Sequence, residues 1–148
     1  MPKHLMVTYH DALIVAPILL SHPLVSAVQL FGSVARNRQG NDLDLILIVP
    51  EEIAKAFYSE TRERHLKRRL VFFTWGSSPA RFRAARKVLG LEFEILLREI
   101  RMQYPHLHLD LFLFPSGWKE RIEELESEIY HRDLGFTARI AEYAVEIA

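Results

Sequence analysis

The stretch LFGSVARNRQGNDLDLILIV, residues 30–49, joins a glycine–serine turn and a polar, basic loop to an apolar strand that carries aspartate. Apart from Asp44, residues 43–49 (LDLILIV) are all apolar, which predicts a short strand covered on both faces. Asp42 and Asp44 stand two positions apart, so both side chains are expected on one face of this strand. Because strand interiors are depleted in Asp, we predict a chemical role for the pair.

The residues around the two aspartates predict a site for a metal and a phosphate. Neighbouring carboxylates repel and raise each other's pKa, and a divalent cation such as Mg²⁺ removes the conflict. Gly32 and Ser33 offer backbone N–H groups and a hydroxyl that could hold a phosphate, and Arg36 adds positive charge. Asp110, in the alternating run at residues 107–114 (LHLDLFLF), is the candidate third carboxylate, on a strand expected to lie beside that of Asp44. Two metals held in this way can activate a hydroxyl and stabilise a leaving pyrophosphate.

The order of the remaining patterns indicates a mixed α/β (α+β) fold, a short mixed β-sheet flanked by helices. Strands are predicted over residues 24–31, 43–49, 70–75 and 107–114. Helices are predicted over residues 10–21, 52–66, 80–104 with a break near Gly90, 118–131 and 136–148. The 148 residues suit a single domain, 1–148, with C-terminal helices from about residue 118.

Composition excludes several classes of protein. No apolar run approaches the roughly 18 residues that a membrane span needs, so we expect no membrane association. Cysteine is absent, which rules out disulfides, thiolate metal sites and a cysteine nucleophile. Its absence fits a reducing cytoplasm, and we expect a cytoplasmic protein.

Charge is unevenly distributed along a chain whose net charge is zero. Residues 62–87 contain nine Lys or Arg and one Glu, whereas residues 88–148 contain six basic and twelve acidic groups. The basic region could contact the phosphates of RNA. A solvated helix surface also explains this cluster of basic residues, and we slightly favour that interpretation.

A glycine–serine pair, a polar loop, Asp-x-Asp on a strand and a later strand aspartate together resemble the nucleotidyltransferase superfamily of DNA polymerase beta. The phrase FGSVARNRQGNDLDLILIV is most similar to the minimal nucleotidyltransferases, whose pattern is Gly-Ser-x-Ala-Arg-Gly, a loop, then Ser-Asp-x-Asp-Leu. The resemblance implies a nucleotidyltransferase fold and Mg²⁺-dependent transfer of a nucleoside monophosphate, AMP from ATP, to a hydroxyl or phosphate of a protein or RNA. The catalytic and metal-binding residues that it implies are Asp42, Asp44 and Asp110. The nucleotide-binding residues that it implies are Gly32, Ser33 and Arg36.

The resemblance also bears on partners. Minimal nucleotidyltransferases often pair with a small helical HEPN-domain protein in toxin–antitoxin modules, which makes such a protein a candidate partner and acceptor. A homo-oligomer is a further candidate assembly. His108 shares the face of Asp110 and is interpreted as a supporting or surface group.

Two departures from the family pattern leave alternatives open. Asn37 stands where the family has Gly, and Asn41 stands where it has Ser or Thr. A second interpretation is therefore a weak or inactive nucleotidyltransferase-fold module that binds a partner through its acidic C-terminal helices. A third is a metal-dependent nucleic-acid-binding protein.

Overall fold

The computed structural model of the chain describes residues 6–63, 73–74, 79–125 and 144–148. The strands are β1 (Val7–Thr8), β2 (Ala27–Phe31), β3 (Gln39–Gly40), β4 (Leu43–Ile48), β5 (Phe73–Thr74), β6 (Leu109–Phe114) and β7 (Val145–Glu146). The helices are α1 (Tyr9–Leu20), α2 (Gly32–Asn37), α3 (Glu51–Glu63), α4 (Pro79–Gln103), the 3₁₀ helix η1 (Trp118–Arg121) and α5 (Ile122–Leu125).

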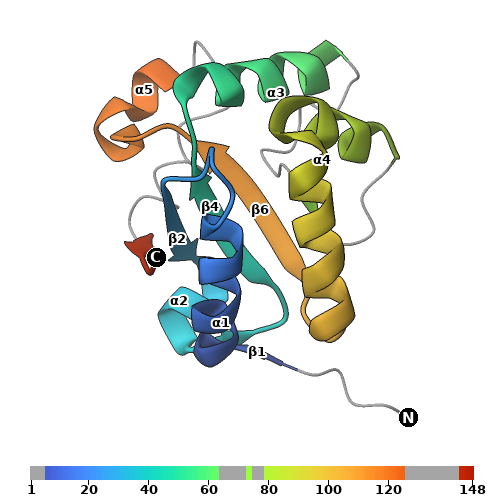
Figure 1. Ribbon diagram of the computed structural model, residues 1–148. Helices are drawn as coiled ribbons and strands as arrows, with labels where there is room; N and C mark the ends of the chain where they lie inside the picture. Colours follow the sequence, from blue (N-terminus) through green and yellow to red (C-terminus); the bar gives the residue numbers. More distant parts are fainter. Residues whose placement is uncertain (1–5, 64–72, 75–78, 126–143) are drawn as a thin grey trace.

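A five-stranded mixed sheet in the order β5-β6-β4-β2-β7 forms the centre of the fold. Strands β4 and β6 are parallel, and the other neighbours are antiparallel. Helix α1 contacts β2, α3 contacts β6 and α4 contacts β5, so helices flank the sheet (Figure 1). A separate pair of short strands, β1 and β3, lies beside α1. The predicted mixed α/β architecture with a small mixed sheet is confirmed.

The two parallel strands have almost the same sequence pattern, LDLILI in β4 and LDLFLF in β6. Every residue of both strands is buried except the aspartate at the second position. Large apolar side chains on both faces drive this burial, as is typical of parallel strands that are covered on both sides. The two patterns therefore bring their only acidic residues to the same end of the sheet.

Helices α1 and α4 are joined by a buried histidine. His22 follows α1, is only 4% exposed, and its Nε2 lies 2.9 Å from the carbonyl oxygen of Leu89. Its ring also meets the ring of Phe93 edge-on at 5.5 Å between centroids. Gly90, with φ 84° and ψ 173°, interrupts α4 where a break was predicted.

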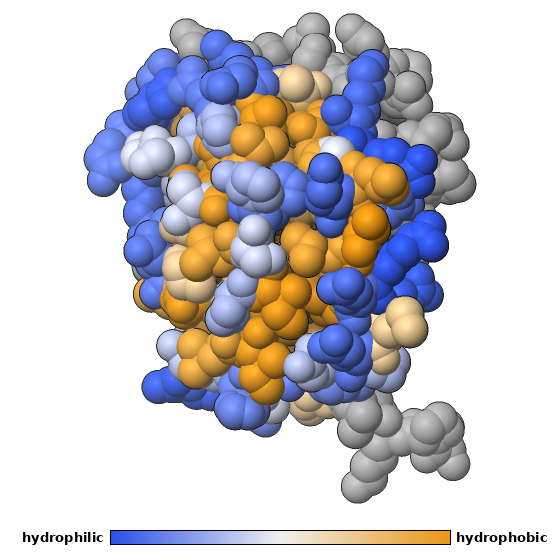
Figure 2. All heavy atoms as spheres, in the orientation of Figure 1, coloured by the Kyte–Doolittle hydropathy of each residue, from blue (hydrophilic) through white to orange (hydrophobic). Residues whose placement is uncertain are grey.

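The outer surface of α1 is apolar. No charged residue follows Asp11 in this helix, and Leu13 is 44% exposed. Figure 2 shows hydrophobic residues gathered over the face of the molecule on which α1 lies. A helix that is apolar on nearly all sides is usually buried, whereas α1 leaves part of its apolar surface exposed. Among the described residues, no helix has both the length and the apolar character needed to cross a membrane.

Most predicted elements in the described regions are confirmed, with small shifts at their ends. Helices were expected over 10–21 and 80–104 and strands over 43–49 and 107–114, close to α1, α4, β4 and β6. The strand expected over 24–31 begins only at Ala27, because a turn comes first, in which the Val25 amide donates to the His22 carbonyl. Of the helix expected over 52–66 and the strand over 70–75, the described parts are α3 and β5, and the rest lies outside the described residues.

The prediction of a helix over residues 136–148 is wrong at its end. Residues 145–146 form β7, which pairs antiparallel with β2. The Val28 amide donates to the Ala148 carbonyl oxygen at 2.8 Å, and the Ile147 amide donates to the Val28 carbonyl at 2.9 Å. The outer edge of β2 has backbone groups that need partners, and the end of the chain supplies them. The helix expected over 118–131 is present as η1 and α5, and its remainder lies outside the described residues.

The start of α1 provides a test of the fold. The Thr8 side chain accepts a hydrogen bond from the Asp11 amide, and the Asp11 carboxylate accepts one from the Thr8 amide, which completes a capping box. Thr8→Ala should lower the free energy of unfolding by about 1 kcal/mol, measured by urea denaturation. Thr8→Ser keeps the hydroxyl and should stay close to wild type. Equal losses in the two variants would contradict a capping role.

Candidate active site

The register of β4 and β6 brings two of the predicted site residues together. Asp44 stands directly opposite Asp110 across the parallel pair, so the two side chains share one face of the sheet. Their carboxyl groups form a side-chain hydrogen bond with each other. The expectation that the strand of Asp110 lies beside the strand of Asp44 is therefore confirmed.

The Asp44 carboxyl holds its proton far above the usual range for an aspartate. Burial is the largest cause, followed by the negative charges of Asp110 and Asp42 and by the hydrogen bond that protonated Asp44 donates to Asp110, and together they raise the pKa of Asp44 from 3.8 to about 8. The nearby charge of Arg36 acts in the opposite direction but is outweighed. At neutral pH the pair thus carries a proton, and such a carboxyl pair can exchange protons with a bound hydroxyl.

Gly32 fits closely against the Asp44 carboxyl. It has φ +79°, and a Cβ added there would lie 2.3 Å from Asp44 Oδ2. The preceding residue, Phe31, is the register partner of Asp44 on β2. Only glycine permits both this backbone conformation and this approach, so the first residue of α2 is shaped around the carboxyl of β4.

Ser33 and the loop that follows α2 are also tightly packed. A Cβ added to Gly40 would lie 2.0 Å from the Ser33 hydroxyl oxygen, so the backbone of β3 runs directly against that hydroxyl. The left-handed residue of this loop is Arg38, with φ 67°, whereas Asn37 is the last residue of α2. The Arg38 guanidinium lies over the Tyr9 ring at 4.3 Å from its centroid, which holds the loop against α1.

The predicted nucleotide-binding arginine, Arg36, lies at the edge of this site. Its side chain is exposed, and its Nε donates to the Gly32 carbonyl oxygen at 3.4 Å. This contact keeps a positive charge beside the glycine–serine turn, and this charge lowers the pKa of Asp44 in part.

Asp42 occupies a different position from the one predicted. It precedes β4 rather than belonging to it, and its Oδ1 lies 2.9 Å from Nδ1 of His108. The carbonyl of His108 accepts a hydrogen bond from the Leu43 amide at 2.8 Å, which extends the β4–β6 pairing toward this contact. Nδ1 of His108 is buried and makes no hydrogen bond of good geometry within the described part of the chain. The sequence pointed to His108 only through its place on the same strand face as Asp110, and did not predict its contact with Asp42.

The three carboxylates do not form a complete metal site as they stand. Among the residues that the structure describes, no three His, Cys, Asp or Glu side chains are arranged to hold a metal ion. Asp44 and Asp110 converge, but Asp42 faces His108. The chemistry of the donors nevertheless suits Mg²⁺, which prefers carboxylate oxygens.

The predicted basic region, residues 62–87, lies largely outside the described residues. The arginine of this region whose side chain is described, Arg86, pairs with the buried Glu94, which Arg98 also contacts at 3.2 Å. Burial raises the pKa of Glu94, but the two arginines outweigh it and leave the pKa lowered. At least one positive charge of the basic region, on Arg86, therefore pairs within α4 and stabilises that helix.

Comparisons with known proteins found no relatives. No protein-family model matches the chain, and neither a curated protein nor a solved structure resembles it significantly.

The buried carboxyl of Asp44 predicts a pH-dependent stability. Folded Asp44 keeps its proton to about pH 8, whereas the carboxyl ordinarily loses it near 3.8. The folded state therefore binds more protons between these values, and stability should fall as pH rises through this interval, by at most about 1.4 kcal/mol per pH unit. Urea denaturation from pH 4 to 9 should show this slope in the wild type and its loss in Asp44→Asn. A wild type whose stability does not fall in this interval would contradict the assignment.

The fit between Gly32 and Asp44 predicts an unusually costly alanine substitution. Gly32→Ala combines a strained positive φ with overlap onto the carboxyl, and should destabilise the fold by more than about 2 kcal/mol. Gly117→Ala is the matched control, because Gly117 has φ +72° but a Cβ added there would lie 4.0 Å from its nearest neighbour, the Glu120 carboxylate. Thermal or urea unfolding should show a clearly larger loss for Gly32→Ala, and equal losses would argue against the close contact.

Proposed function

We propose that the protein is a nucleotidyltransferase that moves a nucleoside monophosphate, AMP from ATP in the simplest case, to a hydroxyl of a protein or RNA acceptor. The observation that carries this proposal is the joined pair of Asp44 and Asp110, with Gly32 packed against the Asp44 carboxyl. A buried acidic pair is costly to keep. The carboxyl pair lies beside the glycine–serine turn. Carboxylates that can hold a metal, next to groups that can bind phosphate, suit a metal-bound triphosphate.

In this proposal each residue has a defined task. The acceptor hydroxyl oxygen forms a bond to the α-phosphorus, the bond from that phosphorus to the pyrophosphate oxygen breaks, and Asp110 takes the hydroxyl proton. Gly32 and Ser33 lie where backbone N–H groups and a hydroxyl could position the triphosphate, and the Arg36 charge favours its approach.

The carboxylates would also hold the metal. Asp42, Asp44 and Asp110 would bind Mg²⁺, which when bound neutralises triphosphate charge. Asp42 would have to leave His108 to take part, and His108 is then a residue that controls the availability of the third carboxylate. The resemblance adds a HEPN-domain protein as a candidate acceptor and partner.

Calorimetric titration of Mg²⁺-ATP into wild type and into the Asp44→Asn/Asp110→Asn double variant tests this function. We expect saturable, Mg²⁺-dependent binding to the wild type and at least a tenfold loss in the double variant. Glu123→Gln, which removes an exposed carboxylate on α5, should bind as wild type does. A wild type that binds none of the four nucleoside triphosphates would overturn the proposal for the isolated chain.

A second candidate function is partner binding by a catalytically inactive module. The apolar outer surface of α1 favours it, because Leu13 is largely exposed in a helix that carries no charge beyond Asp11. The two candidates differ in which residues matter. Association measured by analytical ultracentrifugation with a HEPN-domain protein should be lost in Leu13→Glu and kept in Asp44→Asn if the module acts by binding alone.

A further inference from the structure

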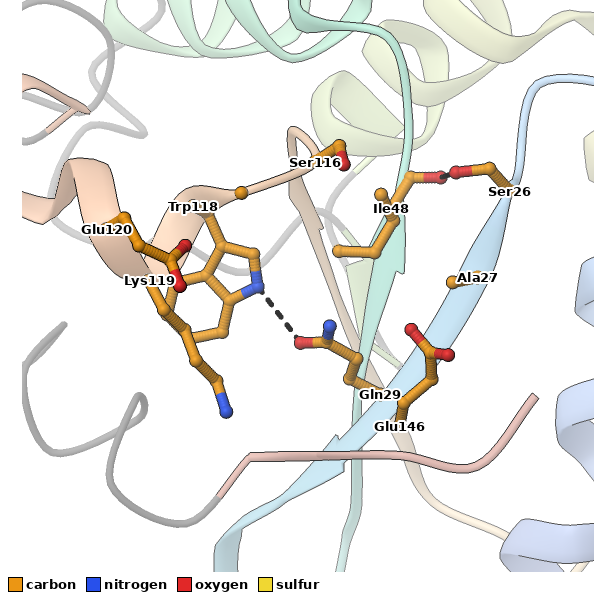
Figure 3. Close-up of a pocket in the computed structure, with 10 residues that line it drawn as sticks. Ser26, Ala27, Gln29, Ile48, Ser116, Trp118, Lys119, Glu120 and Glu146 are labelled. Atoms are coloured by element: carbon orange, nitrogen blue, oxygen red, sulfur yellow. Dashed lines mark hydrogen bonds between the residues drawn. The ribbon is translucent and has the colours of Figure 1, made fainter.

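A pocket of about 490 Å³ lies at the opposite end of the sheet from the aspartate pair. It is bounded by the start of β2, the end of β4 and the segment that leads from β6 into η1 (Figure 3). Ile48, which lines it, stands four residues beyond Asp44 on β4, or about 13 Å along the strand. Open sheets commonly bind ligands beyond the carboxyl ends of their parallel strands, and this pocket lies at the carboxyl ends of β4 and β6.

The orientation of one amide in this pocket is fixed. The indole Nε1 of Trp118 donates a hydrogen bond to Oε1 of Gln29 at 2.9 Å. An indole N–H can only donate, so the amide oxygen must face the tryptophan and the NH₂ group must face away from it. Trp118 is itself 2% exposed and packs on Phe114 at 4.7 Å between ring centroids. The amide is therefore held as a donor toward the pocket (Figure 3).

A carboxylate stands beside this donor. Glu146 on β7 is the register partner of Gln29 on β2, so the two side chains are neighbours on one face of the sheet. Figure 3 shows both side chains directed to the same side, with Glu146 next to the Gln29 amide. Glu146 is exposed, and within the described residues neither its carboxylate nor the Gln29 NH₂ group has a hydrogen-bond partner in the protein. An amide donor and two carboxylate acceptors are thus presented side by side to a ligand.

This pattern selects among planar ligands. A ligand that matches this pattern has one hydrogen-bond acceptor next to two donors. One edge of guanine has this order, with O6 as the acceptor and N1–H and the N2 amino group as the donors. The Gln29 NH₂ would donate to O6, and the two oxygens of Glu146 would accept from N1–H and N2–H. Adenine, cytosine and uracil do not present an acceptor beside two adjacent donor nitrogens, so each makes fewer hydrogen bonds to this pair of side chains. Ala27 and Ile48 give the pocket an apolar wall for a ring.

We propose that this pocket binds a guanine base, presented either by a free nucleotide or by an RNA strand. The proposal stands apart from the function proposed for Asp44 and Asp110, because it depends on a pocket at the other end of the sheet. Loss of nucleotide binding at the aspartate pair would leave it unaffected. At the pocket lining the Ser26 hydroxyl donates to the Ile48 carbonyl oxygen at 3.3 Å, and Ser116 places a second hydroxyl near a bound sugar or phosphate.

The indole N–H of Trp118 gives a direct readout. The chain has two tryptophans, so two indole signals are expected in a ¹⁵N–¹H spectrum, and Trp75→Phe assigns them. GMP should shift the Trp118 signal saturably and bind at least about tenfold more tightly than AMP, CMP or UMP. Glu146→Gln should weaken GMP by a similar factor, whereas Glu123→Gln outside the pocket should not. Thermal melting of both variants checks that the fold is intact.

A parallel titration with a short RNA distinguishes a free nucleotide from an RNA strand as the source of the guanine. The pentanucleotide UUGUU should bind more tightly than GMP if the natural ligand is RNA, and no more tightly if it is a free nucleotide, with UUAUU as the control for sequence. Equal shifts from all four nucleotides, no shift at millimolar GMP, or unchanged GMP binding in Glu146→Gln would each overturn the proposal.

Discussion

The in-register pairing of β4 with β6 is the constraint on which the candidate site depends. Burial of Leu, Ile and Phe side chains on both faces holds β4 against β6, and a slip of one residue would move an aspartate to the opposite face of the sheet. The same register places Asp44 opposite Asp110. Apolar packing therefore holds two carboxyl groups together that would repel each other as ions. Gly32 then completes the arrangement by bringing the start of α2 against Asp44.

The electrostatic consequence is a pair of carboxyl groups that retains a proton at neutral pH. Burial and the neighbouring carboxylates raise the pKa of Asp44, and the exposed Arg36 compensates only in part. Asp42 remains outside the pair, in contact with His108. This division explains why two carboxylates converge while the third does not.

The sequence predicted the parts of the fold that depend on local pattern. The apolar runs with one aspartate each identified β4, β6 and the adjacency of Asp44 and Asp110, and the glycine–serine turn identified the backbone that approaches them. It did not predict the contact of Asp42 with His108, because that contact depends on where β4 begins. It also missed β7, since an apolar segment with helical spacing can equally supply the edge of β2. Glu146, and with it the pocket beside Gln29, became apparent only through that long-range pairing.

The most direct test of the account is a ¹³C NMR titration of the Asp44 carboxyl in wild type and in Asp110→Asn. The account predicts that Asp44 titrates near pH 8 in the wild type. In Asp110→Asn the titration should move to lower pH, because a neighbouring negative charge and the hydrogen bond between the two carboxyls have been removed. An Asp44 that titrates near its ordinary value of 3.8, unaffected by Asp110→Asn, would show that the two strands do not hold a joined acidic pair and would contradict the account.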